Sequence, residues 1–230
     1  MAIHTETHDG YGVLTLDRQE RANAYDRAHL DALEAGFIAL SSEVQVVVIR
    51  AAGSGAFCGG ADLNELAQAT PDDARNLRSQ AVFSTIAKSP AITIAAVHGP
   101  AIGGGCELTL ACDIRVVGPN ARFRLPETSL GIIPAAGGST RLHRLVGRSV
   151  AKQMILGGKT IGAERAVHLG LAMTLADDPS QAAYALAIEL AQRSPDALRL
   201  AKEIIDQPDV ADSLKAELVA QAELYALRKQ

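Results

Sequence analysis

A glycine run that leads into an apolar helix constrains this chain more than any other feature. In residues 99–108, Gly-Pro-Ala-Ile-Gly-Gly-Gly-Cys-Glu-Leu, the glycines connect a strand expected at Ala91–Val97 to a helix. From Cys106 to Cys112 the only side chain normally charged at neutral pH is Glu107. Burying an ionised carboxylate without partners costs several kcal/mol or forces it to keep its proton. We interpret Glu107 as a chemical group, and the alternative is a buried acid satisfied by a structural partner.

Composition bounds the class of protein. The 230 residues are 48% hydrophobic and 21% charged, which suits one main domain with a sizeable core. A net charge of -4 and the absence of a dense Lys/Arg run argue against a nucleic-acid partner. No apolar run approaches the roughly 20 residues that span a bilayer, and no leader segment is evident. We expect a soluble, cytoplasmic protein with no membrane partner.

The cysteines and the glycine motifs predict neither a metal nor a resident cofactor. Cys58, Cys106 and Cys112 form no CxxC pair, so we interpret them as small buried hydrophobes. No His/Asp cluster has metal-ligand spacing. The glycines at 103–105 lack the later features of a dinucleotide fingerprint, and Gly157-Gly158-Lys159-Thr160 lacks the earlier glycine of a phosphate loop.

The order of the expected elements is typical of an α/β fold. A hairpin is expected around Asp9-Gly10, and a helix capped by Asp26 is expected to run to about Leu40, with Leu30, Leu33, Phe37 and Ile38 at helical spacing. Buried strands are expected at Val46–Ile49, Ala91–Val97 and Ile114–Val117. Helices between these strands are expected near Asp62 and over Pro71–Lys88. Crossovers of this length favour parallel neighbours.

The second half of the chain is expected to be helical. Helices are predicted at Thr140–Val146, Ser149–Leu156, Ala163–Leu169, Ser180–Arg193, Pro195–Asp206 and Asp209–Arg228. Ser194-Pro195 is a helix start at which a helical layer can separate from the α/β body. We therefore divide the chain into a core at 1–194 and a helical region at 195–230.

Three segments of small residues each precede an expected helix. They are residues 56–63, the glycine run before Glu107, and residues 125–134. Backbone N–H groups at a helix start are unpaired, and glycine or alanine lets a ligand oxygen approach them closely. Two such starts that face one another would form an oxyanion hole.

These segments resemble the enoyl-CoA hydratase/isomerase, or crotonase, superfamily. The similarity runs through Glu20–Ala24, FCGGADL at 57–63, GGGCEL at 103–108, LPETSLGIIPAAGGSTRL at 125–142 and the helix at Ala163–Leu171. The resemblance implies a spiral of ββα repeats followed by a helical trimerisation region. It also implies homotrimers or dimers of trimers that bind acyl-CoA thioesters, with coenzyme A entering as part of the substrate.

The resemblance also implies roles for individual residues. The oxyanion-hole amides are those of Ala61 and Gly104, and the carboxylates around the catalytic water are Glu107, as base, and Glu127, as proton donor to the α carbon. A simpler interpretation of Glu127 is a first-turn acid that favours its helix, and Asp62 is expected to cap a helix. The expected substrate-binding positions are Asn23, Ala24, Gly60, Asp62, Leu63, Gly103 and Ala135.

The chain departs from the family pattern at two places. Ala135 stands where hydratases commonly have glycine after the proline, so the backbone amide is kept but a methyl group is added. The sequence stops at Ala226-Leu227-Arg228-Lys229-Gln230, where relatives usually continue into a helix that closes the coenzyme A site. We expect this difference to alter coenzyme A affinity or assembly.

The leading hypothesis is reversible syn hydration of a trans-2-enoyl-CoA, because Glu107 and Glu127 are both present. A double-bond isomerase of the same superfamily needs only Glu127 and remains the alternative. A non-catalytic acyl-CoA binder also stays open. An RNA-associated member is disfavoured, since residues 72–88 hold three basic side chains against two acidic ones.

Overall fold

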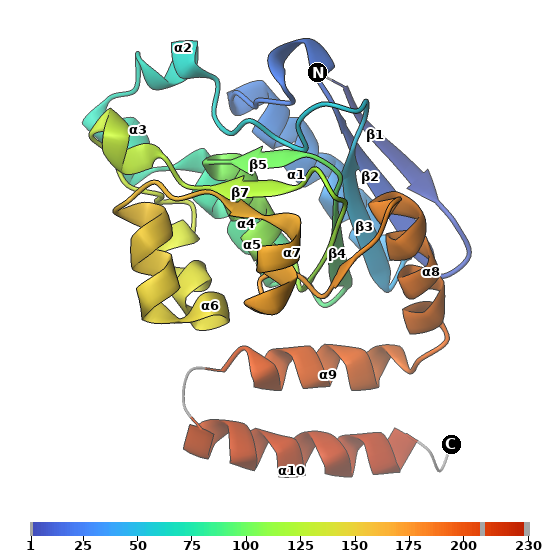
Figure 1. Ribbon diagram of the computed structural model, residues 1–230. Coiled ribbons are helices and arrows are strands. Elements are labelled where there is room, and N and C mark those ends of the chain that lie inside the picture. The colour runs from blue at the N-terminus through green and yellow to red at the C-terminus, as the bar shows by residue number, and fades with distance from the viewer. Residues whose placement is uncertain (1, 208–209, 228–230) are drawn as a thin grey trace.

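The computed structural model describes residues 2–207 and 210–227 and begins with the expected hairpin (Figure 1). Strands β1 (Ala2–Thr7) and β2 (Tyr11–Asp17) pair antiparallel, with Thr7 opposite Gly12. Gly10 has a φ of 79°, a conformation that favours glycine in so short a turn. The turn prediction from Asp9-Gly10 is confirmed.

A six-stranded sheet forms the body, in the order β1-β2-β3-β4-β6-β9. Beyond the hairpin all its pairings are parallel, as the crossover lengths predict. The later strands are β3 (Val46–Ala51), β4 (Ile92–Val97), β6 (Ile114–Val117) and β9 (Thr174–Leu175). A smaller sheet, β5-β7-β8, lies beside it and is made of Pro100–Ile102, Arg122–Arg124 and Ile161–Gly162.

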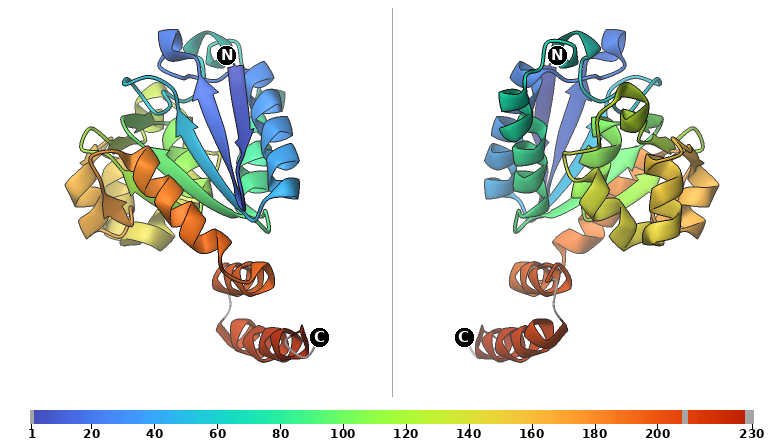
Figure 2. Two further views of the ribbon diagram at one scale, coloured as in Figure 1. Left: turned by 90° about the vertical axis from the view of Figure 1, so that its right-hand side faces the viewer. Right: turned by 90° about the vertical axis from the view of Figure 1, so that its left-hand side faces the viewer.

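Helices cover both faces of the main sheet (Figure 2). On β3, Val47 and Ile49 pack into the cluster that includes Phe37 of α1 (Arg27–Glu43), while Val46 and Val48 pack toward α8 (Pro179–Ala191). Alternate side chains of one strand therefore enter two different cores, which explains its continuous apolar sequence. Asp26 caps α1 as predicted, but Ile38 is 51% exposed, so it does not belong to the buried face.

The single helix predicted over Pro71–Lys88 is wrong. The chain forms α3 (Pro71–Arg75) and α4 (Arg78–Ala87), with a break at Asn76-Leu77. Thr70 and Asp73 start α3 with a reciprocal capping box, and Asn76 leaves helical geometry at φ -114° and ψ 43°. The helix expected near Asp62 is a single turn, α2 (Leu63–Leu66).

The helical second half is present. The two helices predicted at 140–146 and 149–156 are confirmed, because α6 (Gly138–Ile155) consists of two helical segments separated at Gly147, whose φ of 76° and ψ of 161° are not helical. After it come α7 (Ala163–His168), α8, α9 (Pro195–Ile205) and α10 (Val210–Leu227).

Helices α9 and α10 stand below the body in Figure 1, and the buried Lys202 fastens α9 to it. Its Nζ lies 2.9 Å from Oδ2 of Asp113 and donates to the Ala91 carbonyl at 3.1 Å. The division at residue 195 into two units stays a prediction. Residues 228–230, part of the segment in which we expect the chain to be shortened, lie outside the described residues. Within the described ranges, no helix combines the length and apolarity that a membrane crossing requires.

Candidate active site

Glu107 lies inside α5 (Gly104–Ala111), a helix whose eight residues are all buried. Glu107 is only 4% exposed, and its Oε1 accepts a hydrogen bond from the Gly138 backbone amide at 2.8 Å. Burial, together with the nearby charge of Glu127, raises the pKa of Glu107 to about 7. The Gly138 and Ala136 amides and the Arg141 cation oppose this rise because they stabilise the ionised form. Glu107 thus accepts a hydrogen bond from the protein and still has a pKa near neutral pH.

Glu127 opens the 3₁₀ helix η2 (Glu127–Leu130), just after β7. The residue is 7% exposed, and within the described part of the chain its Oε2 has no hydrogen-bond partner. Its Oε1 faces Gly103, where an added Cβ would lie 3.1 Å away. Burial raises the pKa of Glu127. A position in the first turn of a helix would explain why residue 127 is an acid. It does not explain why one of its oxygens is buried without a partner among the described residues.

Two backbone amides are unused close to these acids. Gly104 is the first residue of α5 and so has no helical acceptor for its N–H. Ala61 lies in the loop between β3 and α2, in an isolated bridge with Tyr25. Across residues 2–207 and 210–227, neither the Ala61 nor the Gly104 nitrogen donates a hydrogen bond to a protein acceptor. Both amides remain available to a ligand oxygen.

The two loops that carry these amides approach one another at Gly60. A Cβ added to Gly60 would lie 3.1 Å from the Gly104 nitrogen and 2.8 Å from the Ile102 carbonyl oxygen. Gly60 also has a φ of 94°, which disfavours any side chain. Gly104 is restricted in turn, because a Cβ there would overlap the Tyr25 hydroxyl. The two free amides are therefore brought close together by positions that only glycine fits.

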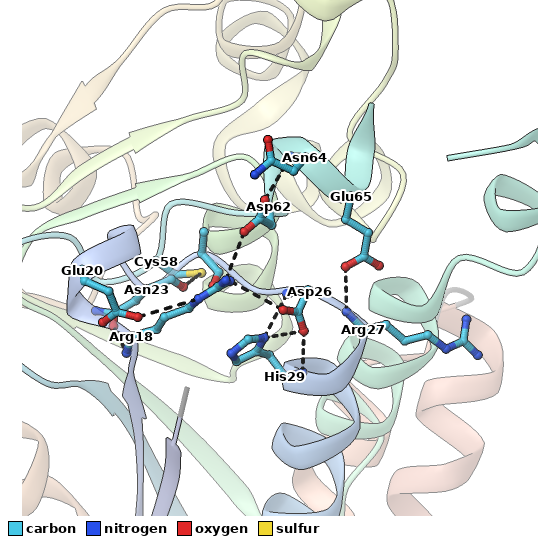
Figure 3. Close-up of polar contacts among 11 residues, drawn as sticks. Arg18, Glu20, Asn23, Asp26, Arg27, His29, Cys58, Asp62, Asn64 and Glu65 are labelled. Carbon is cyan, nitrogen blue, oxygen red and sulfur yellow. Dashed lines mark hydrogen bonds and ion pairs between the residues drawn. The ribbon is translucent and has the colours of Figure 1, made fainter. Parts of the chain in front are cut away.

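Asn23 and Ala24 make hydrogen bonds that hold the segments next to the Ala61 loop in place. Asn23 is buried, accepts a hydrogen bond from the Arg18 amide at 2.7 Å, and donates to the Ala56 carbonyl at 2.8 Å. The Ala24 carbonyl accepts from Arg18 Nη1 at 3.0 Å. Figure 3 shows Arg18 reaching between Asp26 and Asp62. The Asn23 side chain is committed to the protein, so a substrate-binding role there stays a prediction that would use the backbone.

The other expected positions surround this centre. Asp62 caps α2 by accepting the Asn64 amide at 3.0 Å, as predicted, and Leu63 beside it is exposed. Ala135 is half-buried, and its carbonyl accepts from Gln80 Nε2 at 2.6 Å. Their contact with substrate stays a prediction.

A hollow of about 420 Å³ is lined by residues of the same loops and of the first turns of α1 and α2. Its lining includes three arginines and three acids: Arg18, Arg21, Arg27, Asp26, Asp62 and Glu65. Arg18 is paired with two of these acids, whereas Arg21 and Arg27 present exposed side chains.

Sequence reasoning missed three residues that shape the centre. Tyr25 places its buried hydroxyl against Gly104, Gly138 supplies the amide that holds Glu107, and Arg141 donates to the Ala136 carbonyl at 3.0 Å. Tyr25 directly follows Asn23-Ala24, so its proximity to that segment was the available signal. The partners from the 136–141 segment are brought in by tertiary folding, which no local pattern specifies.

Comparison with known proteins agrees with this geometry. The family model described as enoyl-CoA hydratase/isomerase matches residues 6–228. The chain is 39% identical over 213 residues to a probable mitochondrial enoyl-CoA hydratase 2 of Arabidopsis thaliana, covering 89% of this chain and 71% of that protein. It is 38% identical to a 2,3-dehydroadipyl-CoA hydratase of Escherichia coli, covering 94% and 85%.

A solved enoyl-CoA hydratase from Bacillus anthracis superposes with a TM-score of 0.91 at 34% identity, covering 96% of this chain and 89% of that one. The expected crotonase-like α/β fold is thereby confirmed. The match of nearly the whole chain, together with the paired acids beside two free amides, leads to one conclusion: this protein belongs to the enoyl-CoA hydratase/isomerase family.

Proposed function

We propose that this protein is an enoyl-CoA hydratase that adds water reversibly to a trans-2-enoyl-CoA thioester and gives a 3-hydroxyacyl-CoA. The observation that carries the proposal is the pair of buried acids, Glu107 and Glu127, which come from two different elements. They lie beside two amides that donate to no acceptor among the described residues. Hydratases of related acyl-CoA substrates among the similar proteins support the same class of reaction.

The amides of Ala61 and Gly104 would receive the thioester oxygen. When water attacks the β carbon, negative charge moves onto this oxygen, and preorganised donors stabilise it without transferring a proton. Losing one such donor typically costs about 2.7 to 4 kcal/mol of barrier.

The two acids would divide the proton transfers. Glu107 takes one proton from water while the oxygen bonds to the β carbon, and Glu127 gives its proton to the α carbon as the enolate collapses. The pair thus holds one proton before and after the step, and its transfer back from Glu107 to Glu127 completes the cycle. Dehydration follows the same path in reverse. The step uses water, the thioester and these protein groups, with coenzyme A entering as part of the substrate.

The arginine-lined hollow is our candidate for the coenzyme A phosphates, with the exposed side chains of Arg21 and Arg27 as the cations that would bind them. Assembly as a homotrimer or dimer of trimers is also part of the proposal. It is supported by large apolar side chains exposed on α9 and α10, namely Ile205, Leu214, Leu218 and Val219. Sedimentation analysis of the wild type and of Leu218→Glu tests this, because a charge in a buried interface should favour the monomer.

Crotonyl-CoA hydration by the wild type, Glu107→Gln and Glu127→Gln tests the reaction. Each variant should lose at least about 100-fold in kcat, within the range for general acid or base groups. Undiminished turnover by either variant removes that residue from the mechanism. Oε2 of Glu127, which has no hydrogen-bond partner in the described part of the chain, also suits proton shuttling in a double-bond isomerase. A 3-enoyl-CoA that is isomerised normally by Glu107→Gln, with no hydration by the wild type, would favour that second function.

A further inference from the structure

The peptide that carries the Ala61 amide is fixed on both sides by Tyr25. The Tyr25 amide donates to the Gly60 carbonyl at 2.8 Å, and the Asp62 amide donates to the Tyr25 carbonyl at 2.7 Å. In a trans peptide the N–H points opposite to the carbonyl of the preceding residue. Because the Gly60 carbonyl points at Tyr25, the Ala61 N–H points away from Tyr25 and stays free. Rotation of the Gly60–Ala61 peptide would therefore change the direction in which the Ala61 N–H points.

A second restraint comes from Arg18, at the end of β2. Its Nη2 lies 3.2 Å from Oδ2 of Asp62, and its Nη1 donates to the Ala24 carbonyl at 3.0 Å and lies 3.8 Å from Asp26 (Figure 3). The side chains of Arg18 and Asp62 are only 15% and 14% exposed. A guanidinium is planar and offers several donors in a fixed geometry, so one Arg18 side chain can join these groups rigidly.

We propose that Arg18 is a positioning residue that ties Asp62 to the segment 24–26 and thereby holds the Ala61 amide in the direction of the oxyanion hole. The inference rests on the proposed function of that amide. Arg18 itself touches none of the reacting atoms in this scheme. It acts through Asp62, the residue next to the donor.

The loss of Arg18 has a clear physical consequence. Asp62 would become a largely buried carboxylate without its cation, and turning toward water would relieve that cost. The turn would move the adjacent peptide, and misplacing a reacting group by about 1 Å can cost on the order of 100-fold in rate. The competing possibility is that Arg18 binds a substrate phosphate directly, since it also lines the hollow. Ground-state binding of that kind would change KM instead of kcat.

Steady-state kinetics separate these alternatives. Arg18→Gln should lower kcat for crotonyl-CoA hydration by about 10- to 100-fold, below the full loss of an oxyanion donor, with KM changed less than about threefold. A raised KM with unchanged kcat would overturn the proposal. Arg165→Gln removes an exposed arginine on α7 and is the charge-matched control, which should keep wild-type kinetics.

A double-mutant cycle tests the route through Asp62. If Arg18 acts by holding Asp62, then Arg18→Gln combined with Asp62→Asn should be little worse than the more severe single variant. Independent, multiplying effects on kcat would contradict the route. Arg18→Lys keeps the charge without the planar fork and should give an intermediate kcat. If circular dichroism shows that Arg18→Gln does not fold, Arg18→Lys and Asp62→Asn replace it in the kinetic test.

Acetoacetyl-CoA gives a reading that does not need hydration. Its enolate absorbs in the near ultraviolet, and oxyanion donors raise the enolate fraction of the bound ligand. Saturated Arg18→Gln should show a weaker enolate band than the wild type, and a band of full strength would overturn the inference. A wild type that forms the band but hydrates nothing would refute the proposed reaction and leave the role of Arg18 intact. A wild type without the band would overturn both.

Discussion

The Gly138 backbone amide donates a 2.8 Å hydrogen bond to Oε1 of Glu107, although the two residues belong to different helices. This bond stabilises the ionised carboxylate, while burial and the charge of Glu127 favour the protonated form. The balance places the pKa of Glu107 at about 7. Glu107 can therefore both lose and regain a proton near neutral pH.

In the proposed reaction Glu107 must be ionised to accept a proton from water, so hydration should weaken in acid. Its ionised form is lost as the pH falls through about 7, so kcat/KM should decline below that value. When Glu127 is ionised its negative charge raises the pKa of Glu107, so Glu127→Gln should lower that pKa. A pH profile of the wild type tests the first statement. Infrared titration of the carboxyl band, assigned with Glu107→Gln, tests the second, and an unmoved band would contradict it.

The ionised Glu107 should cost the fold stability at alkaline pH. Its pKa rises from 4.5 to about 7 on folding, so the stability supplied by the protonated form is present in acid and is lost as the pH rises through 7. Glu107→Gln keeps an oxygen acceptor without the charge. It should raise the free energy of unfolding by about 2 to 3 kcal/mol at pH 8.5 and by much less at pH 5. Urea unfolding at both pH values measures this, with the exposed Glu164→Gln as control.

Arg141 should set the acid limb of the activity profile. Its guanidinium holds the Ala136 carbonyl at 3.0 Å, and its charge lowers the pKa of Glu107. Arg141→Gln removes that cation and loosens the turn that supplies the Ala136 and Gly138 amides. The acid limb of kcat/KM should therefore move to higher pH. Arg148→Gln, an exposed change on the same helix, should leave the limb in place, and an equal shift there would indicate a general charge effect.

The sequence allowed the main architecture to be predicted because its signals are local. Apolar runs indicated β3, β4 and β6, and Asp26 indicated the start of α1. The break at Asn76-Leu77 was missed, since a single-turn helix can end in a stretch whose composition still favours helix. The interruption of α6 was predicted, because Gly147 lies between two helical patterns and adopts a non-helical conformation that glycine allows.

The acids of the candidate site could be selected from sequence, but their surroundings could not. An acid in an apolar helix is conspicuous, and the family motifs pointed to Glu127 and to the two amides. The partners of Glu107 and the ion pairs of Arg18 depend on segments far apart in the chain. Such contacts follow from tertiary packing, and the two hydrogen bonds by which Asn23 supports a loop are an example that no local pattern specifies.

Adding one methyl group at Gly60 should separate the Ala61 and Gly104 amides, the proposed oxyanion donors. A Cβ there would lie 2.8 Å from the Ile102 carbonyl oxygen and 3.1 Å from the Gly104 nitrogen, so the loops must part. Gly60→Ala should reduce kcat by about 100-fold or more, comparable to losing one donor. Gly55→Ala adds the same methyl group where no atom lies within 4 Å and should retain wild-type kcat. Stopped-flow hydration of crotonyl-CoA by the two variants decides the matter.

The attachment of α9 should depend on Lys202. Replacing it with Met would leave Asp113 without the cation that lies 2.9 Å from its Oδ2. Removing one member of a buried ion pair typically costs about 3 to 5 kcal/mol. Lys202→Met should therefore lower the denaturation midpoint in urea and speed amide exchange in α9. If the double variant Lys202→Met with Asp113→Asn restores normal amide exchange in α9, the result supports the ion pair. Normal exchange in Lys202→Met alone would contradict it.

The close approach of the Gly60 loop to the first turn of α5 has a thermal consequence. The two donors belong to separate parts of the chain and are aligned only while those parts stay in contact. If warming loosens the Gly60 loop alone, the Ala61 and Gly104 amides lose their alignment while the central sheet is still intact. Catalytic power should therefore disappear several degrees before the cooperative melting transition and return on cooling.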